Sequence, residues 1–395
     1  MHLAPALAAR GHQVLALGLR QNVAMPGVQY LNYSIARGNH PEQHPWLISF
    51  ESQVLRGQAC AQRLAELRQH NWYPDCVVAH AGWGEALFVK DIFPQTKLLC
   101  FLEFAYHSRG FDVGFDPEFS QDDWQKLAPV GLKNATNLLM LAQMDAAYTP
   151  THWQKSTQPE VYQPQIKVIH DGIDTGLLQP HPGRTVQVNT SDGPVTLRAG
   201  DKVISFVNRN LEPYRGYHQF MRALPAIQQA HPDAMIFIVG GDKHSYGSAA
   251  PEGQSWKQLF LDEVKAQLDL SKVFFTGQLS YQAYQHLLQV SACHVYLSYP
   301  FVLSWSLLEA MSMQCAIVAS ATAPVMEVIQ DGENGMLVDF FNPQDLAVKV
   351  NHILSSPECY TSMREQARRF VQNHYDLNTV CLPQQIALVE QLGSR

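Results

Sequence analysis

The sequence predicts an α/β protein built from two doubly wound parallel-sheet domains. Short apolar runs alternate with helical segments along almost the whole chain, which is typical of parallel sheets covered by helices on both faces. The chain has 395 residues, 46% of them hydrophobic and 16% charged, which is enough for two cores of ordinary size. The alternation is interrupted once, by a stretch rich in proline and glycine at residues 175–200, where we place the join between the domains.

The chain opens with a helix rather than with a strand. Residues 2–10 have a helical pattern, Gly11 can end that helix, and residues 13–17 form the first expected strand. A βα unit that begins at its helix lacks a strand, so we expect the first sheet to lack its first strand. Either the domain tolerates this gap or the chain has been shortened at its start. The amino-terminal residues also lack the basic segment and apolar core of a secretory signal.

The rest of the first domain follows the same alternation. Polar residues with proline and glycine extend to about residue 46, and strand-length apolar runs then follow between helical patterns. The expected elements are a helix at 49–70, strands at 76–79 and 97–101, a helix at 130–144, and strands at 146–148 and 166–169.

The second domain begins at Lys202, where the alternation restarts. Before it, Val186–Val188 and Val195–Leu197 could pair as a small hairpin. Strands are expected at 203–207, 235–239, 273–276, 294–297, 316–319 and 336–338, and helices at 217–229, 256–268, 281–290, 305–313, 325–329, 345–354, 358–373 and 378–391. We therefore expect a first domain at 1–180, a linker with a hairpin at 181–201, a second domain at 202–372, and a helix at 373–395 that returns to the first domain.

The composition narrows the class of protein. A net charge of −7 argues against a general nucleic-acid or anionic-membrane surface, so any anion site must be local. The longest apolar runs are far shorter than the roughly 20 residues that cross a bilayer. Seven cysteines without a C-x-x-C pair indicate buried free thiols in a reducing compartment. These features predict a cytoplasmic protein, with peripheral contact to the inner face of the membrane left open.

Tyr299–Gly335 is the most informative segment for function. Ser304 can cap a helix, whose free N–H groups would face an anion at the positive end of the helix dipole. Glu309 lies just over one turn further in, where a carboxylate can bind two vicinal hydroxyls such as those of a ribose. A second turn at Thr322–Val325 follows the next strand, so both loops should lie at one edge of a sheet, where such sheets bind ligands.

A second anion signal follows the first strand of the second domain. Arg209 and Arg215 flank a turn that contains Pro213 and precede a helix, so both guanidinium groups could reach one diphosphate. Taken alone, they could also be two exposed loop arginines. Because the loop before Ser304 is a second candidate phosphate-binding loop in the same domain, we favour the interpretation that the two arginines bind a diphosphate.

At these residues the sequence resembles the retaining family-4 (group 1) glycosyltransferases of the GT-B fold, strongly over about 200–355 and more weakly over 1–180. Arg209 and Arg215 match the pair that clamps the donor diphosphate in that family, and Leu307–Met311 matches its L-L-E-A-M frame. Further matches are the small-residue loop and following helix at 320–329, the D-G-x-N-G turn at 331–335, the strand-end turn at 170–174 and the base-contacting loop at 276–279.

The resemblance implies roles for individual residues. Arg209 and Arg215 would stabilise the leaving diphosphate, and Glu103 and His107 would lie near the reacting sugar. The other donor-binding residues would be Glu309 on the ribose, with Leu303, Ser304, Gly277, Gln278 and Leu279. No cofactor is implied, because the UDP- or GDP-linked sugar is itself the substrate.

The acceptor side should come from strand ends of the first domain. His80, Gly82 and Glu85 form one candidate group, and Glu103 with His107 the other. Each group could instead cap a helix or make an internal hydrogen bond. The aromatic and acidic segment at 111–119 could hold a sugar, or it could be a tucked loop.

We predict no metal site. Asp122-Asp123 and Asp171-x-x-Asp174 lack the Asp-x-Asp spacing of metal-dependent transferases. The segment from His40 to His44 has the spacing of a metal pair, but its proline and loop context favour a polar surface turn.

Two departures from the family pattern stand out. Phe301 occupies the position eight residues before Glu309 where the family has an acid beside the transferred sugar. The absent first strand also carries, in the family, a glycine loop that approaches the donor.

The predicted activity is that of a retaining, metal-independent hexosyltransferase-type glycosyltransferase, which moves a sugar to a glycan or lipid-linked acceptor in polysaccharide or glycoconjugate synthesis. One alternative is another GT-B enzyme, such as an epimerase or a glycan phosphorylase, although no lysine is an obvious candidate for the phosphorylase cofactor. The other alternative is a non-catalytic nucleotide-sugar-binding protein, favoured by Phe301 and the absent strand.

Overall fold

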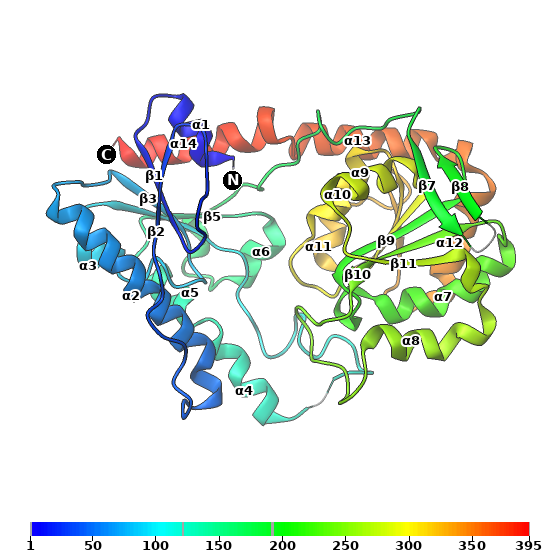
Figure 1. Ribbon diagram of the computed structural model, residues 1–395, viewed down its shortest axis with the longest axis horizontal. Coiled ribbons are helices and arrows are strands. Elements are labelled where there is room, and N and C mark those ends of the chain that lie inside the picture. The colour runs from blue at the N-terminus through cyan, green and yellow to red at the C-terminus, as the bar shows by residue number, and fades with distance from the viewer. Residues whose placement is uncertain (1, 121, 191–192, 395) are drawn as a thin grey trace. The chain divides into compact units, whose positions relative to one another are not determined.

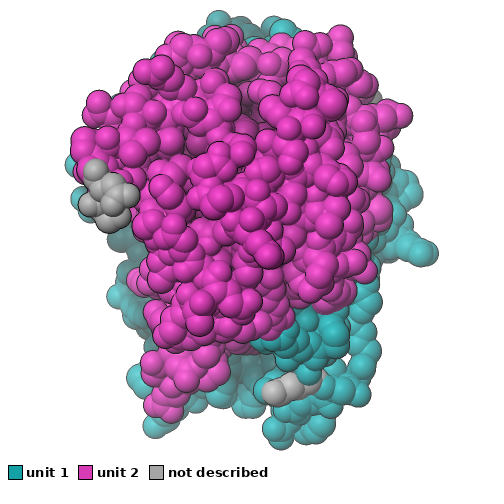
Figure 2. Space-filling view, turned by 90° about the vertical axis from the view of Figure 1, so that its right-hand side faces the viewer, with its two compact units in different colours: residues 1–172, 378–395 teal, residues 173–377 magenta. Residues whose placement is uncertain are grey.

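The computed structural model describes residues 2–120, 122–190 and 193–394. It divides into two compact units, which Figure 2 colours separately: unit 1 comprises residues 1–172 and 378–395, and unit 2 comprises residues 173–377. Ser191 and Asp192, part of the expected linker, lie outside the described residues. Both units contain parallel strands alternating with helices (Figure 1), which confirms the predicted α/β class.

Unit 1 contains two parallel ladders, a pair in the order β1-β2 and a four-stranded sheet in the order β3-β4-β5-β6. Strands β3 and β4 are paired in parallel from Cys76 opposite Lys97 to His80 opposite Phe101, so the two strands end side by side. The strands are β1 Val14–Gly18, β2 Val28–Asn32, β3 Cys76–His80, β4 Lys97–Phe101, β5 Ala146–Thr149 and β6 Ile166–Val168. The helices are α1 Leu3–Ala9, α2 Ile48–Gln69, α3 Val89–Ile92, α4 Trp124–Leu132, α5 Ala135–Leu141, α6 His152–Thr157 and α14 Leu382–Gly393.

The sequence did not predict the short helices α3 and α6, and its prediction also differs from the structure at β2 and at the helix expected at 130–144. Strand β2 lies within the stretch that was expected to be irregular, because Val28, Tyr30 and Leu31 supply a β-forming run that pairs with β1. The single helix expected at 130–144 is two helices, α4 and α5. Between them the Asn134 side chain bonds both backbone groups of Tyr106, at 2.8 Å from its N–H and 2.7 Å to its carbonyl, which fixes the break.

Helix α14 brings the end of the chain onto unit 1. Its Glu390 accepts hydrogen bonds from Arg10 at 2.8 Å and from His12 at 3.0 Å, and its Gln385 donates to the carbonyl of His170 at 2.9 Å. These bonds attach the helix to the start of the chain and to the end of β6.

Unit 2 is built on a six-stranded parallel sheet with the order β11-β10-β9-β12-β13-β14. The predicted hairpin is present as the antiparallel pair β7-β8. The strands are β7 Thr185–Thr190, β8 Gly193–Arg198, β9 Val203–Asn210, β10 Met235–Gly241, β11 Val273–Gly277, β12 Cys293–Tyr296, β13 Ala316–Ser320 and β14 Met336–Val338. The helices are α7 Tyr217–Ala230, α8 Trp256–Val264, α9 Tyr281–Val290, α10 Trp305–Ser312, α11 Ala323–Met326, α12 Pro343–Ser355 and α13 Thr361–His374.

This strand order predicts where unit 2 binds a ligand. Counted from β9, the order is the 3-2-1-4-5-6 arrangement of dinucleotide-binding sheets, in which the connections on either side of the first strand run in opposite directions. The loops that follow β9 and β12 therefore separate at the carboxyl edge of the sheet. Ligands bind at that switch point in open α/β sheets.

The remaining sequence expectations concern cysteines and membrane spans. All seven cysteines are free, and five of them are buried. Burial raises the pKa of the Cys60 and Cys100 thiols to about 12, so neither is a reactive thiolate at neutral pH. In the part of the chain that the structure describes, every helix is too short or too polar to cross a bilayer.

Two buried histidines predict a loss of stability in acid. Burial lowers the pKa of His170 to about 4 and that of His294, whose Nδ1 lies 2.9 Å from Ser205 Oγ, to about 3. Unfolded histidine titrates near pH 6.5, so below that pH the unfolded chain binds protons that the folded chain does not. The free energy of unfolding should fall by about 1.4 kcal/mol per pH unit for each histidine between about pH 6.5 and 4.

Urea unfolding at half-unit pH steps measures this slope. His294→Asn, whose side chain can still hydrogen-bond to Ser205, should remove the contribution of His294 to this slope. His181→Asn, at an exposed position, should leave the slope unchanged. A wild-type stability that stays flat between pH 6.5 and 4.5 would contradict the assignment.

Candidate functional site

The first part of the site is Arg215, at the end of the short helical turn Pro213–Arg215 that follows β9. The residue is 5% exposed, and its Nη1 donates to Ser298 Oγ at 2.7 Å, to the Val302 carbonyl at 3.1 Å and to Tyr296 Oη at 3.3 Å. All three bonds use one nitrogen. Nε and Nη2 have no hydrogen bond to a described residue, so the fork is held in one orientation with donors left for an anion.

The turn that carries Arg215 is fixed by close backbone packing. Gly216 has a φ of +68°, and a Cβ at this position would overlap the side chain of Leu297, the first residue after β12. Only glycine allows this approach without strain. The loop after β9 is therefore pressed against the loop after β12, at the switch point of the sheet.

Arg209 is placed differently from Arg215. It lies at the exposed end of β9, and its guanidinium carbon is 5.8 Å from the centroid of the Tyr246 ring. The same ring lies 5.1 Å from the guanidinium carbon of Arg215. Tyr246 thus links the two arginines that the sequence paired as a diphosphate clamp.

The start of α10 is tied to Arg215 through one tyrosine hydroxyl. Tyr296 Oη accepts a hydrogen bond from the backbone N–H of Ser304 at 2.9 Å, as well as the one from Arg215. Ser304 caps α10 as predicted, since its Oγ accepts from the N–H of Ser306. The hydroxyl of Ser320, the last residue of β13, accepts from the N–H of Ser298 at 3.1 Å. The arginine and the helix start therefore share one rigid hydrogen-bond network.

Glu309 lies on α10 and is only 7% exposed. Its Oε1 accepts from Tyr281 Oη at 2.9 Å and its Oε2 from Tyr284 Oη at 2.6 Å. Burial raises the pKa of the carboxyl above its usual value, while the two tyrosine hydroxyls oppose that rise. An ionised carboxylate offers about four acceptor sites, so two remain after the tyrosines are counted, which matches two vicinal hydroxyls.

The loop after β11 leads directly into the helix that orients Glu309. Gly277 has a φ of +66°, Gln278 is exposed, and Ser280 then caps α9, on which Tyr281 and Tyr284 lie. The Leu303 side chain is buried in the hydrophobic core of unit 2, and the partly buried side chain of Leu279 packs against that core. This arrangement puts the predicted base loop next to the predicted ribose carboxylate.

Phe301 belongs to an aromatic group around Arg215. It is 3% exposed, and its ring centroid lies 5.7 Å from the guanidinium carbon of Arg215, 5.1 Å from the Tyr246 ring and 5.2 Å from the Tyr214 ring. Where the family pattern has an acid, this chain therefore places an aromatic ring against the buried cation.

A buried carboxylate holds the Tyr246 loop in place. Glu212 is fully buried and accepts backbone N–H bonds from Ser245 at 3.1 Å, Tyr246 at 3.3 Å and Gly247 at 3.2 Å. The sequence did not single out Glu212, Tyr246, Tyr281, Tyr284 or Tyr296. Only the position of Tyr281 and Tyr284 directly after the predicted base loop could have indicated a role.

In unit 1, the structure brings together His80 and Glu103 from the two predicted acceptor groups. His80 Nε2 lies 3.4 Å from Glu103 Oε2, while its Nδ1 accepts the N–H of Gly82 at 3.0 Å. Glu85 is directed elsewhere, accepting a hydrogen bond from Tyr33 Oη at 2.7 Å and lying 3.7 Å from Arg56. Glu85 thus makes the internal hydrogen bond that was the alternative expectation for this group.

His107 does not meet Glu103 through any hydrogen bond between described residues. Its Nε2 donates to the carbonyl of Thr157 at 2.8 Å, and its ring stacks on Phe111 with centroids 4.1 Å apart. In this geometry it orders the loop after β4.

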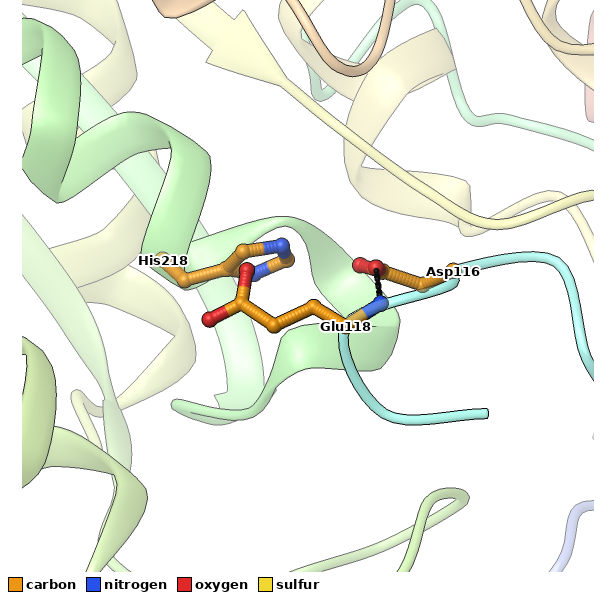
Figure 3. Close-up of side chains that lie close together, drawn as sticks. All are labelled: Asp116, Glu118 and His218. Carbon is orange, nitrogen blue, oxygen red and sulfur yellow. Dashed lines mark hydrogen bonds between the residues drawn. The ribbon is translucent and has the colours of Figure 1, made fainter. Parts of the chain in front are cut away.

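The aromatic and acidic segment at 111–119 contains ordered turns. Figure 3 shows the backbone N–H of Glu118 donating to Asp116 Oδ1, at 3.0 Å. Gly114, with a φ of +77°, supplies the left-handed residue of the preceding bend. This geometry favours the tucked loop over an open sugar-binding loop.

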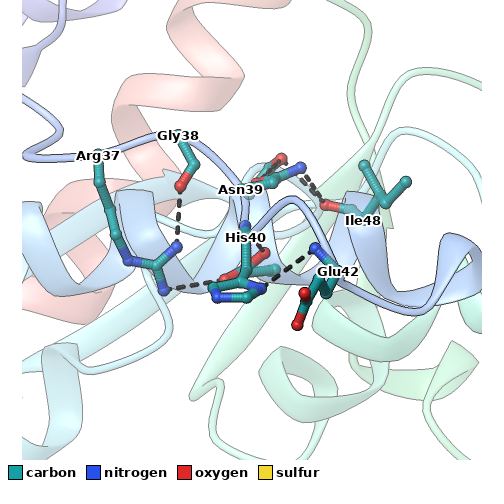
Figure 4. A network of polar contacts seen from close by, with 8 residues as sticks. Arg37, Gly38, Asn39, His40, Glu42 and Ile48 are labelled. Carbon is teal, nitrogen blue, oxygen red and sulfur yellow. Dashed lines mark hydrogen bonds and ion pairs between the residues drawn. The ribbon is translucent and has the colours of Figure 1, made fainter.

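His40 and His44, whose spacing is that of a metal-binding pair, both accept hydrogen bonds within local turns. His40 Nδ1 accepts the N–H of Glu42 at 3.2 Å (Figure 4), and His44 Nδ1 accepts the N–H of Trp46 at 3.3 Å. Arg37 and Glu51 complete the polar network, with 2.9 Å between their charged groups. The segment is a polar surface turn.

Known proteins match both halves of the chain. A family model described as "Glycosyl transferase family 4 group" matches residues 10–178, and one described as "Glycosyl transferases group 1" matches residues 189–370. Spore coat protein SA of Bacillus subtilis is 28% identical over 53% of this chain and 55% of that protein, so the chain spans only about half the length of this relative.

Two other similar proteins are covered over most of their length. Glycogen synthase of Mycobacterium tuberculosis is 22% identical over 100% of this chain and 91% of that protein. The structure of Anabaena HepE in complex with UDP and glucose is 19% identical, with a TM-score of 0.59 over 93% of this chain and 87% of that one. From the two family matches and this shared architecture, the chain belongs to the group 1, family-4 glycosyltransferases of the GT-B fold.

Proposed function

We propose that this protein transfers a sugar from a UDP- or GDP-linked donor to a glycan or lipid-linked acceptor, with retention and without a metal, in polysaccharide or glycoconjugate synthesis. The observation that carries the proposal is the pairing of two preoriented groups at one switch point. Arg215 keeps Nε and Nη2 available beside the start of α10, and Glu309 keeps two acceptor sites on the same helix. Together they fit a diphosphate joined to a ribose.

The chemistry assigned to each group follows from where charge changes during transfer. Breaking the bond between the sugar and the diphosphate leaves negative charge on the phosphate oxygens, and the acceptor hydroxyl forms the new bond and gives up its proton. Fixed guanidinium groups and N–H donors stabilise such charge without a metal. Arg215 and Arg209 supply these donors in unit 2, whereas the N–H groups of Ser304, Ser306 and Leu307 at the start of α10 already donate within the chain.

The base is proposed to contact the loop at Gly277 and Gln278, which leads into the helix of Tyr281 and Tyr284. HepE, which shares the fold, was solved with UDP and glucose, and this supports uridine as the first base to test. Glycogen synthase among the relatives supports a hexose as the transferred unit.

Phe301 favours a second candidate function, that of a protein that binds nucleotide sugars without turnover. Its buried position against Arg215 leaves no acid at that point of the sequence. The two functions share the nucleotide site and differ in the fate of the donor.

Product analysis separates them. The full chain is incubated with radiolabelled UDP-, GDP- and ADP-hexoses, with and without a membrane and glycan extract, and free nucleoside diphosphate and labelled product are measured. For a transferase, we expect nucleoside diphosphate release from one donor, with label moving to an acceptor. Tight nucleotide binding with no release under any condition would instead establish the binding protein.

A further inference from the structure

Trp83 is an exposed aromatic side chain at the carboxyl edge of the unit 1 sheet. It is 56% exposed, and its ring stacks on that of His80, the last residue of β3, with centroids 4.3 Å apart and an interplanar angle of 13°. His80 in turn lies 5.4 Å from the ring of Phe101, the last residue of β4. One face of the indole therefore packs on His80, and His80 packs on Phe101, at the ends of two neighbouring strands.

The loop that carries Trp83 is rigidly attached to α2. A Cβ on Gly84, whose φ is +103°, would overlap the backbone of Gln53, and a Cβ on Gly57 would lie 2.7 Å from the Gly84 carbonyl. The Gln53 side chain donates to the Gly82 carbonyl at 2.9 Å. Trp83 thus lies between Gly84, which packs against the backbone of α2, and Gly82, which is hydrogen-bonded to α2. These contacts order the loop, and with it the indole ring, before a ligand binds.

A carboxylate lies next to the stacked rings. Because His80 Nδ1 accepts the Gly82 N–H, its proton resides on Nε2, which points to Glu103 at 3.4 Å. The Glu103 side chain is 49% exposed, so it has acceptor sites open to a ligand. A flat apolar face and a hydroxyl-binding carboxylate therefore stand side by side on one sheet edge.

We propose that Trp83 and Glu103 form the binding subsite for a hexopyranose ring of the acceptor. A pyranose has an apolar C–H face that packs on an indole and equatorial hydroxyls at its rim that donate to a carboxylate. Trp83 supplies the platform, Glu103 binds a hydroxyl, and His80 positions both. The inference rests on the proposed transfer reaction and identifies which side chains of unit 1 recognise its second substrate.

The test uses two independent readouts on the full chain. Saturation-transfer NMR is recorded with methyl α-D-glucopyranoside, methyl α-D-mannopyranoside, methyl β-D-galactopyranoside and N-acetylglucosamine, and UDP and GDP binding is measured by calorimetry. Trp83→Ala should weaken the binding of the responding sugar roughly tenfold or more, Trp83→Phe should restore part of it, and Glu103→Gln should weaken it while saturation of the ring protons persists. Nucleotide binding should stay unchanged in all three.

Trp124→Ala is the matched control, because Trp124 is 67% exposed in the same unit but packs edge-on against Trp46. It should bind the sugar as the wild type does. The absence of saturation transfer from all four sugars, or an equal loss in Trp83→Ala and Trp124→Ala, would overturn the subsite while leaving the donor site standing. A failure of nucleotide binding in the wild type would instead count against the proposed function.

Discussion

Arg215→Met is expected to lower kcat by about a hundredfold to a thousandfold, with a much smaller change in donor KM. The guanidinium is already fixed by Ser298, Tyr296 and Val302, so it can meet charge that develops on the diphosphate without reorganising. Losing one such preorganised donor costs about 3–4 kcal/mol in the transition state. Initial-rate kinetics on the donor identified by product analysis measure the effect.

Two further variants separate a catalytic loss from a folding loss. Arg222→Met removes an arginine of the following helix that pairs with Glu263 at 2.6 Å, and it should leave kcat unchanged. Arg215→Lys keeps the charge but loses the fork, so it should recover only part of the rate. If Arg215→Met stays folded by thermal unfolding and turns over at the wild-type rate, the assigned role is wrong.

Glu309→Ala is expected to raise donor KM by roughly thirtyfold, about 2 kcal/mol. The substitution removes both acceptor sites assigned to the ribose and leaves the buried hydroxyl of Tyr284 without its 2.6 Å partner. Because the ribose contact is the same in the ground state and in the transition state, kcat should change far less than KM. Donor titrations at saturating acceptor give both constants.

Glu309→Gln sharpens this prediction, since the amide keeps the shape and one acceptor oxygen but loses the charge. We expect its KM to lie between those of the wild type and Glu309→Ala. Glu263→Ala, at an exposed carboxylate of the same unit, is the matched control and should not affect KM. If Glu309→Ala bound UDP with unchanged affinity, the assignment of the ribose to Glu309 would be wrong.

The sequence was sufficient for the parts of the site that depend on local pattern. Ser304 as a helix cap and the order of strands and loops around Arg209 and Arg215 follow from neighbouring residues, whereas the loop at Gly277 was identified only through the resemblance to the family. It could not show how Arg215 is held, because Tyr296 and Val302 lie more than 80 residues further along the chain. Long-range hydrogen bonds leave no periodic signal in one sequence.

The first domain was harder to predict for a related reason. The pairing of Glu103 with His80 rather than with His107 depends on the register of β3 on β4, which places residues 80 and 101 opposite one another. The role of Trp83 could not be predicted from the sequence, because a single tryptophan in a glycine-containing loop has no distinctive spacing. Its importance emerges only from the stacking on His80 and its exposed fraction.

The proposed function requires unit 2 to bind a nucleoside diphosphate through Arg215 and Glu309. Calorimetric titration of UDP, GDP and ADP into the wild type, Arg215→Met and Glu309→Ala measures this binding. We expect the wild type to bind one of the three nucleotides, and each variant to bind that nucleotide more weakly while remaining folded. Equal affinity of all three proteins for that nucleotide, or no binding of any of the three nucleotides by the wild type, would show that these two residues do not form the site.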